Sequence, residues 1–229
     1  MKKLKCVIFD FNGTLLFDSK FHIESFNRYL EKAGKPTLSK EELIRSVFGR
    51  PNSELYKKYF NPNANDDEIE LFAKEKEQKY VDNYINHPET ICFPAGVAEM
   101  LDFLKKSGIP YAIATGSDKI NVDFYLEHLK IDRWFSYDNI FYNDGSFRGK
   151  PAPDIYQLTA KKLGFDPSEC LIFEDAKSGI LSANAANAGA VISIHEPSIP
   201  SGVDDDVKVS LEISDFLDFK SIFKKFGLI

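Results

Sequence analysis

Short apolar runs and amphipathic stretches alternate along the chain from about residue 92 onward. Short apolar runs that end in turn residues are typical of buried parallel strands, and the amphipathic stretches between them are typical of crossover helices. With the run near the amino terminus that ends in Asp10, the expected strands are 7–9, 109–114, 139–142, 170–173 and 190–194. The expected helices are 97–106, 120–129, 154–163 and 179–188. This alternation predicts right-handed βαβ crossovers and a mainly parallel sheet.

The region from residue 17 to residue 90 has a different pattern, in which helical periodicity dominates and strand-like runs are absent. The expected helices are 22–32, 41–47, 53–59 and 66–84. Because this region follows the first strand, the pattern predicts an all-helical domain, 17–90, inserted into an α/β domain formed by 1–16 and 91–229. The predicted fold class is therefore α/β, a doubly wound, mainly parallel sheet with a helical cap over its carboxyl edge. Residues 216–226 are expected to form a final surface helix with an aromatic face.

Composition narrows the class of protein. Hydrophobic residues make up 43% of the 229 residues, which is enough for a sizeable core, and the net charge of −6 argues against a nucleic-acid partner. No apolar run is long enough to span a membrane or to act as a signal peptide, so we expect no membrane association and a cytoplasmic location. Cys6, Cys92 and Cys170 show no metal-ligand spacing and are expected to be small buried hydrophobic residues.

Four polar motifs follow the expected strands, and each has a chemical interpretation. Asp10 could attack phosphorus as a carboxylate nucleophile. Thr115-Gly116-Ser117 could bind an anion at a strand-to-helix junction, although Ser117 could equally cap the helix. Lys150, in the segment 149–156, could neutralise a phosphoryl group. The pair Glu174-Asp175 could bind a hard cation such as Mg2+, or could cap the next helix.

The four motifs, in this order, resemble those of the haloacid dehalogenase (HAD) superfamily. The resemblance is to members with a helical cap, which include the β-phosphoglucomutase-like and phosphoglycolate-phosphatase-like enzymes. It implies an aspartyl-phosphate mechanism with Mg2+ as cofactor. It assigns Asp10 as the nucleophile, Lys150 as the neutralising cation, and Thr115, Gly116 and Ser117 as phosphoryl-binding residues. It assigns the metal ligands as Asp10, the backbone carbonyl of Asn12, Asp175, and Glu174 through water.

Asn12 is the point at which the sequence departs from this superfamily, which has a second aspartate there. An amide cannot carry the proton that a carboxyl group would transfer to the leaving oxygen, and such assistance is typically worth about 10²–10⁴-fold. The alternatives are a phosphatase that is slow or that favours substrates with good leaving groups, a proton donor elsewhere, a deliberately substituted residue 12, or deamidation of Asn12-Gly13 to aspartate. His22, on the first expected cap helix, is a candidate donor and substrate contact, and the alternative is a solvated or core-edge histidine without such a role.

The substrate is expected to be a small phosphorylated metabolite. Arg50 lies in a Gly-Arg-Pro segment that resembles a substrate-contacting loop, although the same segment could begin a helix capped by Ser53. Lys119 is expected to be a surface charge. A phosphatase is the leading prediction, and a sugar-phosphate mutase and a non-catalytic phosphometabolite-binding protein are the alternatives. The chain is expected to be a monomer or a homodimer.

Overall fold

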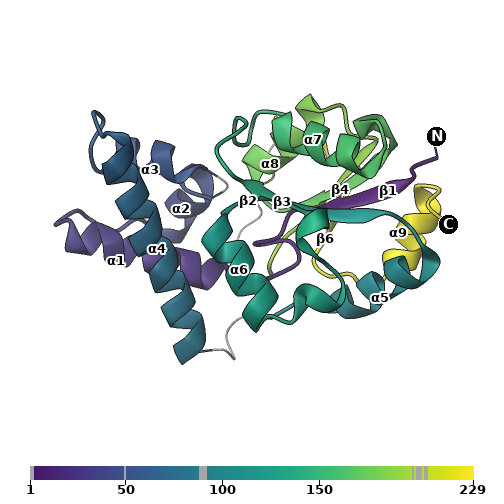
Figure 1. Cartoon of the computed structure of the whole chain (residues 1–229), viewed down its shortest axis with the longest axis horizontal. Helices are drawn as coiled ribbons and strands as arrows, with labels where there is room; N and C mark the ends of the chain where they lie inside the picture. Colours follow the sequence, from purple (N-terminus) through teal and green to yellow (C-terminus); the bar gives the residue numbers. More distant parts are fainter. Residues whose placement is uncertain (1–2, 49, 88–91, 198, 200–202, 204–205) are drawn as a thin grey trace.

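The computed structural model describes residues 3–48, 50–87, 92–197, 199, 203 and 206–229, and its centre is a parallel sheet (Figure 1). The six strands have the order β3-β2-β1-β4-β5-β6, and every neighbouring pair is parallel. Their bounds are β1 Cys6–Phe9, β2 Tyr111–Asp118, β3 Ile140–Asn143, β4 Cys170–Glu174, β5 Ala190–Ile194 and β6 Leu211–Ile213. The predicted α/β class with a parallel sheet is confirmed.

Helices cover both faces of this sheet (Figure 1). Val7 and Phe9 of β1 belong to a core cluster that includes residues of α5 (Val97–Ser107), α6 (Lys119–His128) and α9 (Phe219–Lys225). Cys6 and Ile8 belong to a second cluster, with residues of α7 (Asp154–Leu163) and α8 (Lys177–Ala185). Because both faces are buried, β1, β4 and β5 read as continuous apolar runs, which is why they were recognisable in the sequence.

Among the described residues between β1 and α5, the cap has four helices, α1 Ser19–Lys32, α2 Lys40–Ser46, α3 Asn52–Tyr59 and α4 Asp66–Asn86. They surround a small core of their own that includes Phe26, Leu43 and Phe72. The polypeptide leaves and re-enters the α/β part at adjacent points, where the Phe17 N–H donates to the Cys92 carbonyl over 2.9 Å. The exact domain boundaries, 16/17 and 90/91, stay predictions, and the second lies outside the described residues.

Several details differ from expectation, among them the bounds of β2, which includes Thr115-Gly116-Ser117 and ends at Asp118 and not at Ala114. β6 was not predicted, because Leu211 and Ile213 are only partly buried, Glu212 between them is exposed, and the three residues form no apolar run. Cys6 and Cys170 are buried as expected, but Cys92 is exposed, so that prediction was wrong for Cys92. The terminal helix α9 is shorter than predicted, and its Phe219 and Phe223 are buried against the sheet.

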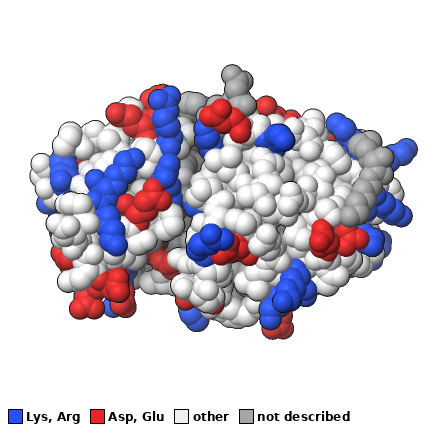
Figure 2. Space-filling model, turned by 90° about the horizontal axis from the view of Figure 1, so that it is seen from above, with Lys and Arg blue, Asp and Glu red and all other residues white. Residues whose placement is uncertain are grey.

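The surface carries charges of both signs. On the face shown in Figure 2, Lys and Arg side chains are interspersed with Asp and Glu side chains over both the cap and the α/β part. Among the described residues, no helix is long and apolar enough to cross a membrane.

Candidate active site

The register of the sheet brings the acidic motifs together. Phe9 of β1 pairs with Phe173 of β4, and the Asp10 N–H donates to the Phe173 carbonyl over 2.9 Å. Residues that follow these two strands must therefore lie side by side. The strand order also reverses between β1 and β4, and ligands of open α/β sheets bind outside the carboxyl ends of the strands at such a point.

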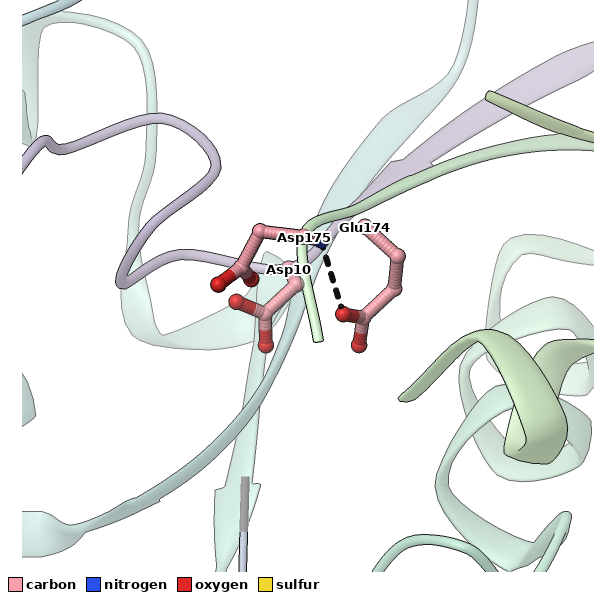
Figure 3. A group of neighbouring side chains, drawn as sticks. All are labelled: Asp10, Glu174 and Asp175. Atoms are coloured by element: carbon pink, nitrogen blue, oxygen red, sulfur yellow. Dashed lines mark hydrogen bonds between the residues drawn. The ribbon is translucent and has the colours of Figure 1, made fainter. Parts of the chain in front are cut away.

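Three carboxyl groups gather there. One ligand oxygen from each of Asp10, Glu174 and Asp175 lies within 4.8 Å of the others. Figure 3 shows the carboxylates of Asp10 and Asp175 facing each other, while Glu174 lies on the other side of the chain and accepts a hydrogen bond from the Asp175 N–H. Burial, together with the charge of Glu174, raises the pKa of Asp10 to about 7 although Lys150 opposes the shift. Burial and the charges of Glu174 and Asp10 raise the pKa of Asp175 well above its usual range.

Lys150 supplies the positive charge of this cluster. Its Nζ donates to Asp10 over 2.6 Å, to Glu174 over 2.5 Å and to the Ala114 carbonyl over 3.2 Å. Burial alone would lower the pKa of Lys150, but the charges of Asp10 and Glu174 outweigh it and raise this pKa. Tyr156, which had no assigned role in the sequence, donates to the same Glu174 oxygen over 2.6 Å. Lys150 and Tyr156 therefore hold Glu174 in place.

The donor set suits a hard divalent cation. Three carboxyl groups face one ammonium, so full ionisation leaves an excess of negative charge that Mg2+ would neutralise, and oxygen ligands are those that Mg2+ prefers. The turn at Gly13 and Thr14 allows the Asp175 carboxylate to lie against the backbone. A Cβ on Gly13, whose φ is +78°, would lie 2.1 Å from an Asp175 carboxylate oxygen. Thr14 donates its hydroxyl to the other Asp175 oxygen over 3.2 Å.

The helix-capping alternatives for the polar motifs are wrong. Helix α8 begins at Lys177 with Ala176 as its N-cap residue, so neither Glu174 nor Asp175 occupies the N-cap position, although Glu174 accepts from the Ala176 N–H over 3.2 Å. The N-cap residue of α6 is Asp118, not Ser117. Ser117 instead donates its hydroxyl to Asn12 over 2.8 Å. In the cap, the N-cap residue of α3 is Pro51 and not Ser53.

Asn12 has a partner for each of its polar atoms. Its Oδ1 accepts from the hydroxyl groups of Ser117, over 2.8 Å, and Tyr125, over 2.9 Å. Its Nδ2 donates to Asp18 Oδ2 over 2.5 Å. Thr115 Oγ1 accepts from the Ser117 N–H over 3.1 Å, which orders the same loop. Hydrogen bonds with Ser117, Tyr125 and Asp18 therefore fix the orientation of the Asn12 amide.

Asp18 is a site residue that the sequence analysis missed. It is 2% exposed, and its Oδ2 also accepts from the Tyr80 hydroxyl of α4. His22 Nε2 lies 3.3 Å from the same oxygen, and its ring stacks on Tyr80. Asp18 Oδ1 has no hydrogen-bond partner among the described residues. A single acid at the start of a helix carries no signal in the sequence, because helix-capping acids look the same.

A cavity of about 150 Å³ between the cap and the α/β part unites the predicted residues. All ten candidates line it, namely Asp10, Asn12, His22, Arg50, Thr115, Gly116, Ser117, Lys150, Glu174 and Asp175. Arg50, which precedes α3, is only partly directed to it, because its guanidinium pairs with Glu54 of α3 and its side chain is 36% exposed. Lys119 pairs with Asp123 at the surface, as expected of a surface charge.

Comparison with known proteins decides the family. The family model of haloacid dehalogenase-like hydrolases matches residues 7–192. This chain belongs to that family. Among curated HAD relatives it is 33% identical over 204 residues to protein CbbY of Rhodobacter capsulatus, a match that covers 85% of this chain and 87% of that protein. It is 29% identical over 195 residues to a phosphorylated carbohydrates phosphatase of Thermotoga maritima, covering 83% and 85% of the two chains.

Two solved structures have a similar fold, and one of them is named as a HAD hydrolase. A family IA HAD hydrolase from Entamoeba histolytica is 34% identical and covers 98% of each chain with a TM-score of 0.82. A β-phosphoglucomutase from Clostridium difficile, 22% identical with a TM-score of 0.77 over 98% and 97% of the two chains, shares the fold. The chain is therefore a HAD-like hydrolase with the helical cap of subfamily IA.

Proposed function

We propose that the protein is a Mg2+-dependent phosphatase of small phosphorylated metabolites that works through an aspartyl phosphate. The observation that carries this proposal is the contact of Asp10 with Lys150 beside Asp175, in the lining of the cavity. A carboxylate that is held against an ammonium and beside a cation-binding group can approach a phosphate monoester without full charge repulsion. The phosphatase named among its relatives supports the same reaction class.

The proposed reaction has two displacements. Thr115, Gly116 and Lys150 bind the phosphoryl oxygens, and an Asp10 carboxylate oxygen attacks phosphorus. The bond from Asp10 to phosphorus forms as the bond from phosphorus to the ester oxygen breaks. Water then attacks the aspartyl phosphate, which releases inorganic phosphate and restores the carboxylate. Mg2+, held by Asp10, Asp175 and the Asn12 carbonyl with Glu174 through water, would supply charge neutralisation.

The leaving oxygen needs a proton, and the amide of Asn12 cannot give one. We therefore propose that proton transfer limits turnover by about 10²–10⁴-fold relative to a site with a carboxyl group at position 12. Esters with acidic leaving groups, such as aryl phosphates, need less protonation and should be favoured. His22 remains the proposed donor from the cap, because it lines the cavity. A cytoplasmic location and a monomer or homodimer remain proposals.

Phosphate release from a panel of phosphate esters, with Mg2+ and with chelator, tests this function. We expect Mg2+-dependent release that Asp10→Asn abolishes while the protein stays folded. Asp132→Asn, at an exposed position outside the cavity, is the matched control and should keep full activity. Full activity of Asp10→Asn would refute the nucleophile. Conversion of β-glucose 1-phosphate to glucose 6-phosphate without phosphate release would point to the mutase instead, and binding without turnover to a non-catalytic protein.

A further inference from the structure

Cys6 and Cys170 carry two buried thiols that the proposed reaction does not use. Cys6 begins β1 and Cys170 begins β4, and the register of these neighbouring parallel strands sets the two residues directly opposite each other. Both belong to the core cluster that includes residues of α7 and α8, so their side chains share one face of the sheet. In Figure 1 the chain enters β1 beside the N-terminus, at the end of the sheet away from the cap. The pair is therefore separate from the candidate active site.

The two sulfur atoms are in contact. Cys6 Sγ lies 2.9 Å from Cys170 Sγ, and both residues are 0% exposed. A disulfide bond is about 2.05 Å long, so the sulfur atoms need to approach each other by less than about 1 Å to form one. Neighbouring strands lie about 4.7–4.9 Å apart, which is within the Cα separation of about 4.4–6.8 Å that disulfides span. A bond between the two cysteines therefore requires no rearrangement of the sheet.

The pair reacts slowly while it is covered. The hydrogen bond that Cys6 donates to Cys170, together with burial, raises the pKa of Cys6, and a thiol is a far weaker nucleophile than a thiolate. Cys170 Sγ donates to the Asp166 carbonyl over 3.5 Å. The Glu169 carbonyl lies 4.0 Å from Cys6 Sγ, so the segment 166–169 lies against both sulfur atoms. An oxidant therefore reaches the pair when this end of the sheet opens locally.

The contact also decides which oxidation product forms. Oxidation of either thiol gives a sulfenic acid, which condenses with a second thiol to a disulfide or is oxidised further to a sulfinic acid. The partner sulfur is already in place, and a reaction between groups held in contact proceeds as if the partner were very concentrated. Cys92, the third cysteine of the chain, is exposed and follows the cap in sequence, so it does not belong to this cluster. Capture by the partner should therefore precede a second oxidation.

We propose that Cys6 and Cys170 form a reversible internal disulfide when a hydroperoxide oxidises the protein, so that the pair is a redox modification site. In the first step a thiolate sulfur attacks one peroxide oxygen, and the S–O bond forms as the O–O bond breaks. The other sulfur then attacks the sulfenic sulfur, so that the S–S bond forms as the S–O bond breaks and water leaves. With hydrogen peroxide the two thiols lose two electrons and two protons in total, and the peroxide becomes two waters. This inference does not depend on the proposed phosphatase function.

The disulfide should stabilise the fold. It would join β1 to β4 across a sequence separation of 164 residues. A crosslink over so long a loop restricts the unfolded chain, and we expect the oxidised protein to melt about 5–10 °C above the reduced protein. An oxidised form that melts at the same temperature as the reduced form, or below it, would contradict this stabilisation.

Treatment of the Cys92→Ser protein with hydrogen peroxide tests the site, because this variant keeps only the buried pair. The reaction is run about 10 °C below the melting temperature, where local opening is frequent. We expect both thiols to disappear together, the intact mass to fall by two hydrogen atoms, and a peptide map to join residue 6 to residue 170. Dithiothreitol should then restore both thiols. Persistence of both thiols, or sulfinic acid as the main product, would overturn the proposal.

Single-cysteine variants test whether the partner captures the sulfenic acid. Cys6→Ala and Cys170→Ala, each made in the Cys92→Ser protein, leave one buried thiol without a partner. Dimedone, which traps sulfenic acids, should label these variants at least about tenfold more than the protein with the pair. Equal labelling of all three proteins would show that the partner does not intervene and would overturn the proposal. If an alanine variant does not fold, the peptide map of the Cys92→Ser protein still decides whether the disulfide forms.

Discussion

Exchanging the side chains of Asn12 and Asp18 gives the sharpest test of the site geometry. Asn12 Nδ2 donates to Asp18 Oδ2 over 2.5 Å, so the pair is one amide matched to one carboxylate. Asn12→Asp alone would set two carboxylates against each other. The double variant Asn12→Asp/Asp18→Asn would restore one amide and one carboxylate, with the carboxylate now on the nucleophile loop.

The size of the effect follows from the spacing. Oxygen and nitrogen atoms at 2.5 Å imply charge centres about 4 Å apart, where two unit charges repel by about 4 kcal/mol at an effective dielectric constant of about 20. Above neutral pH the single variant should therefore unfold with a free energy lower by up to about 4 kcal/mol. At about pH 5 the pair can retain one proton, and the loss should be smaller.

Urea unfolding of the four proteins of this cycle, at about pH 5 and pH 8, measures the coupling free energy between the two positions. We expect the double variant to recover most of the stability that Asn12→Asp loses. Phosphate release with Mg2+ should rise by about 10²–10⁴-fold in the double variant over the unsubstituted protein, because a carboxyl group then occupies position 12. A coupling below about 0.5 kcal/mol at pH 8 would show that the two side chains do not touch.

The remaining predictions concern the acidic cluster. Lys150→Met should abolish phosphate release and lower the free energy of unfolding by about 3–5 kcal/mol, because it leaves the buried Asp10 carboxylate unpaired. Denaturant titration measures this loss. An unchanged midpoint of unfolding would contradict the ion pair between Lys150 and Asp10. Gly13→Ala should abolish Mg2+-dependent phosphate release, because the added Cβ would lie 2.1 Å from an Asp175 carboxylate oxygen. Gly145 has a similar φ of +79° but open space around it, so Gly145→Ala is the control. It should lower the free energy of unfolding by only about 1 kcal/mol and keep full activity. Without metal, the free energy of unfolding should fall by up to about 4 kcal/mol as the pH rises from about 4 to 7. The reason is the raised pKa of Asp10, because in this pH range the folded state holds a proton that the unfolded state releases. Thermal melts should then show a larger stabilisation by Mg2+ at about pH 8 than at about pH 5, and equal stabilisation at both would argue against a cation at these carboxylates.

The sequence alone determined the architecture, since the periodicity of buried strands and amphipathic helices is a local property. The bounds of α7 and β5 match the prediction residue for residue. It also determined which side chains follow the strands, and parallel strands necessarily bring such residues to one edge. Asp10, Lys150 and Asp175 could therefore be assigned to one site from the sequence. The sequence did not predict the weakly apolar strand β6 or the exposure of Cys92, because the burial of a single short segment depends on what packs over it.

Only the tertiary structure decided how those side chains are paired. Neither the contact of Asn12 with Asp18 nor the support of Glu174 by Tyr156 leaves a periodic trace in the chain, because each joins residues whose side-chain directions depend on neighbouring elements. The hydrogen bond from Asn121 to Glu77 is the clearest case, since the two residues come from α6 and α4, which meet only when the cap docks on the core. Local pattern thus fixed the chemistry available at the sheet edge, whereas long-range packing fixed the charges and acceptors that a substrate would meet.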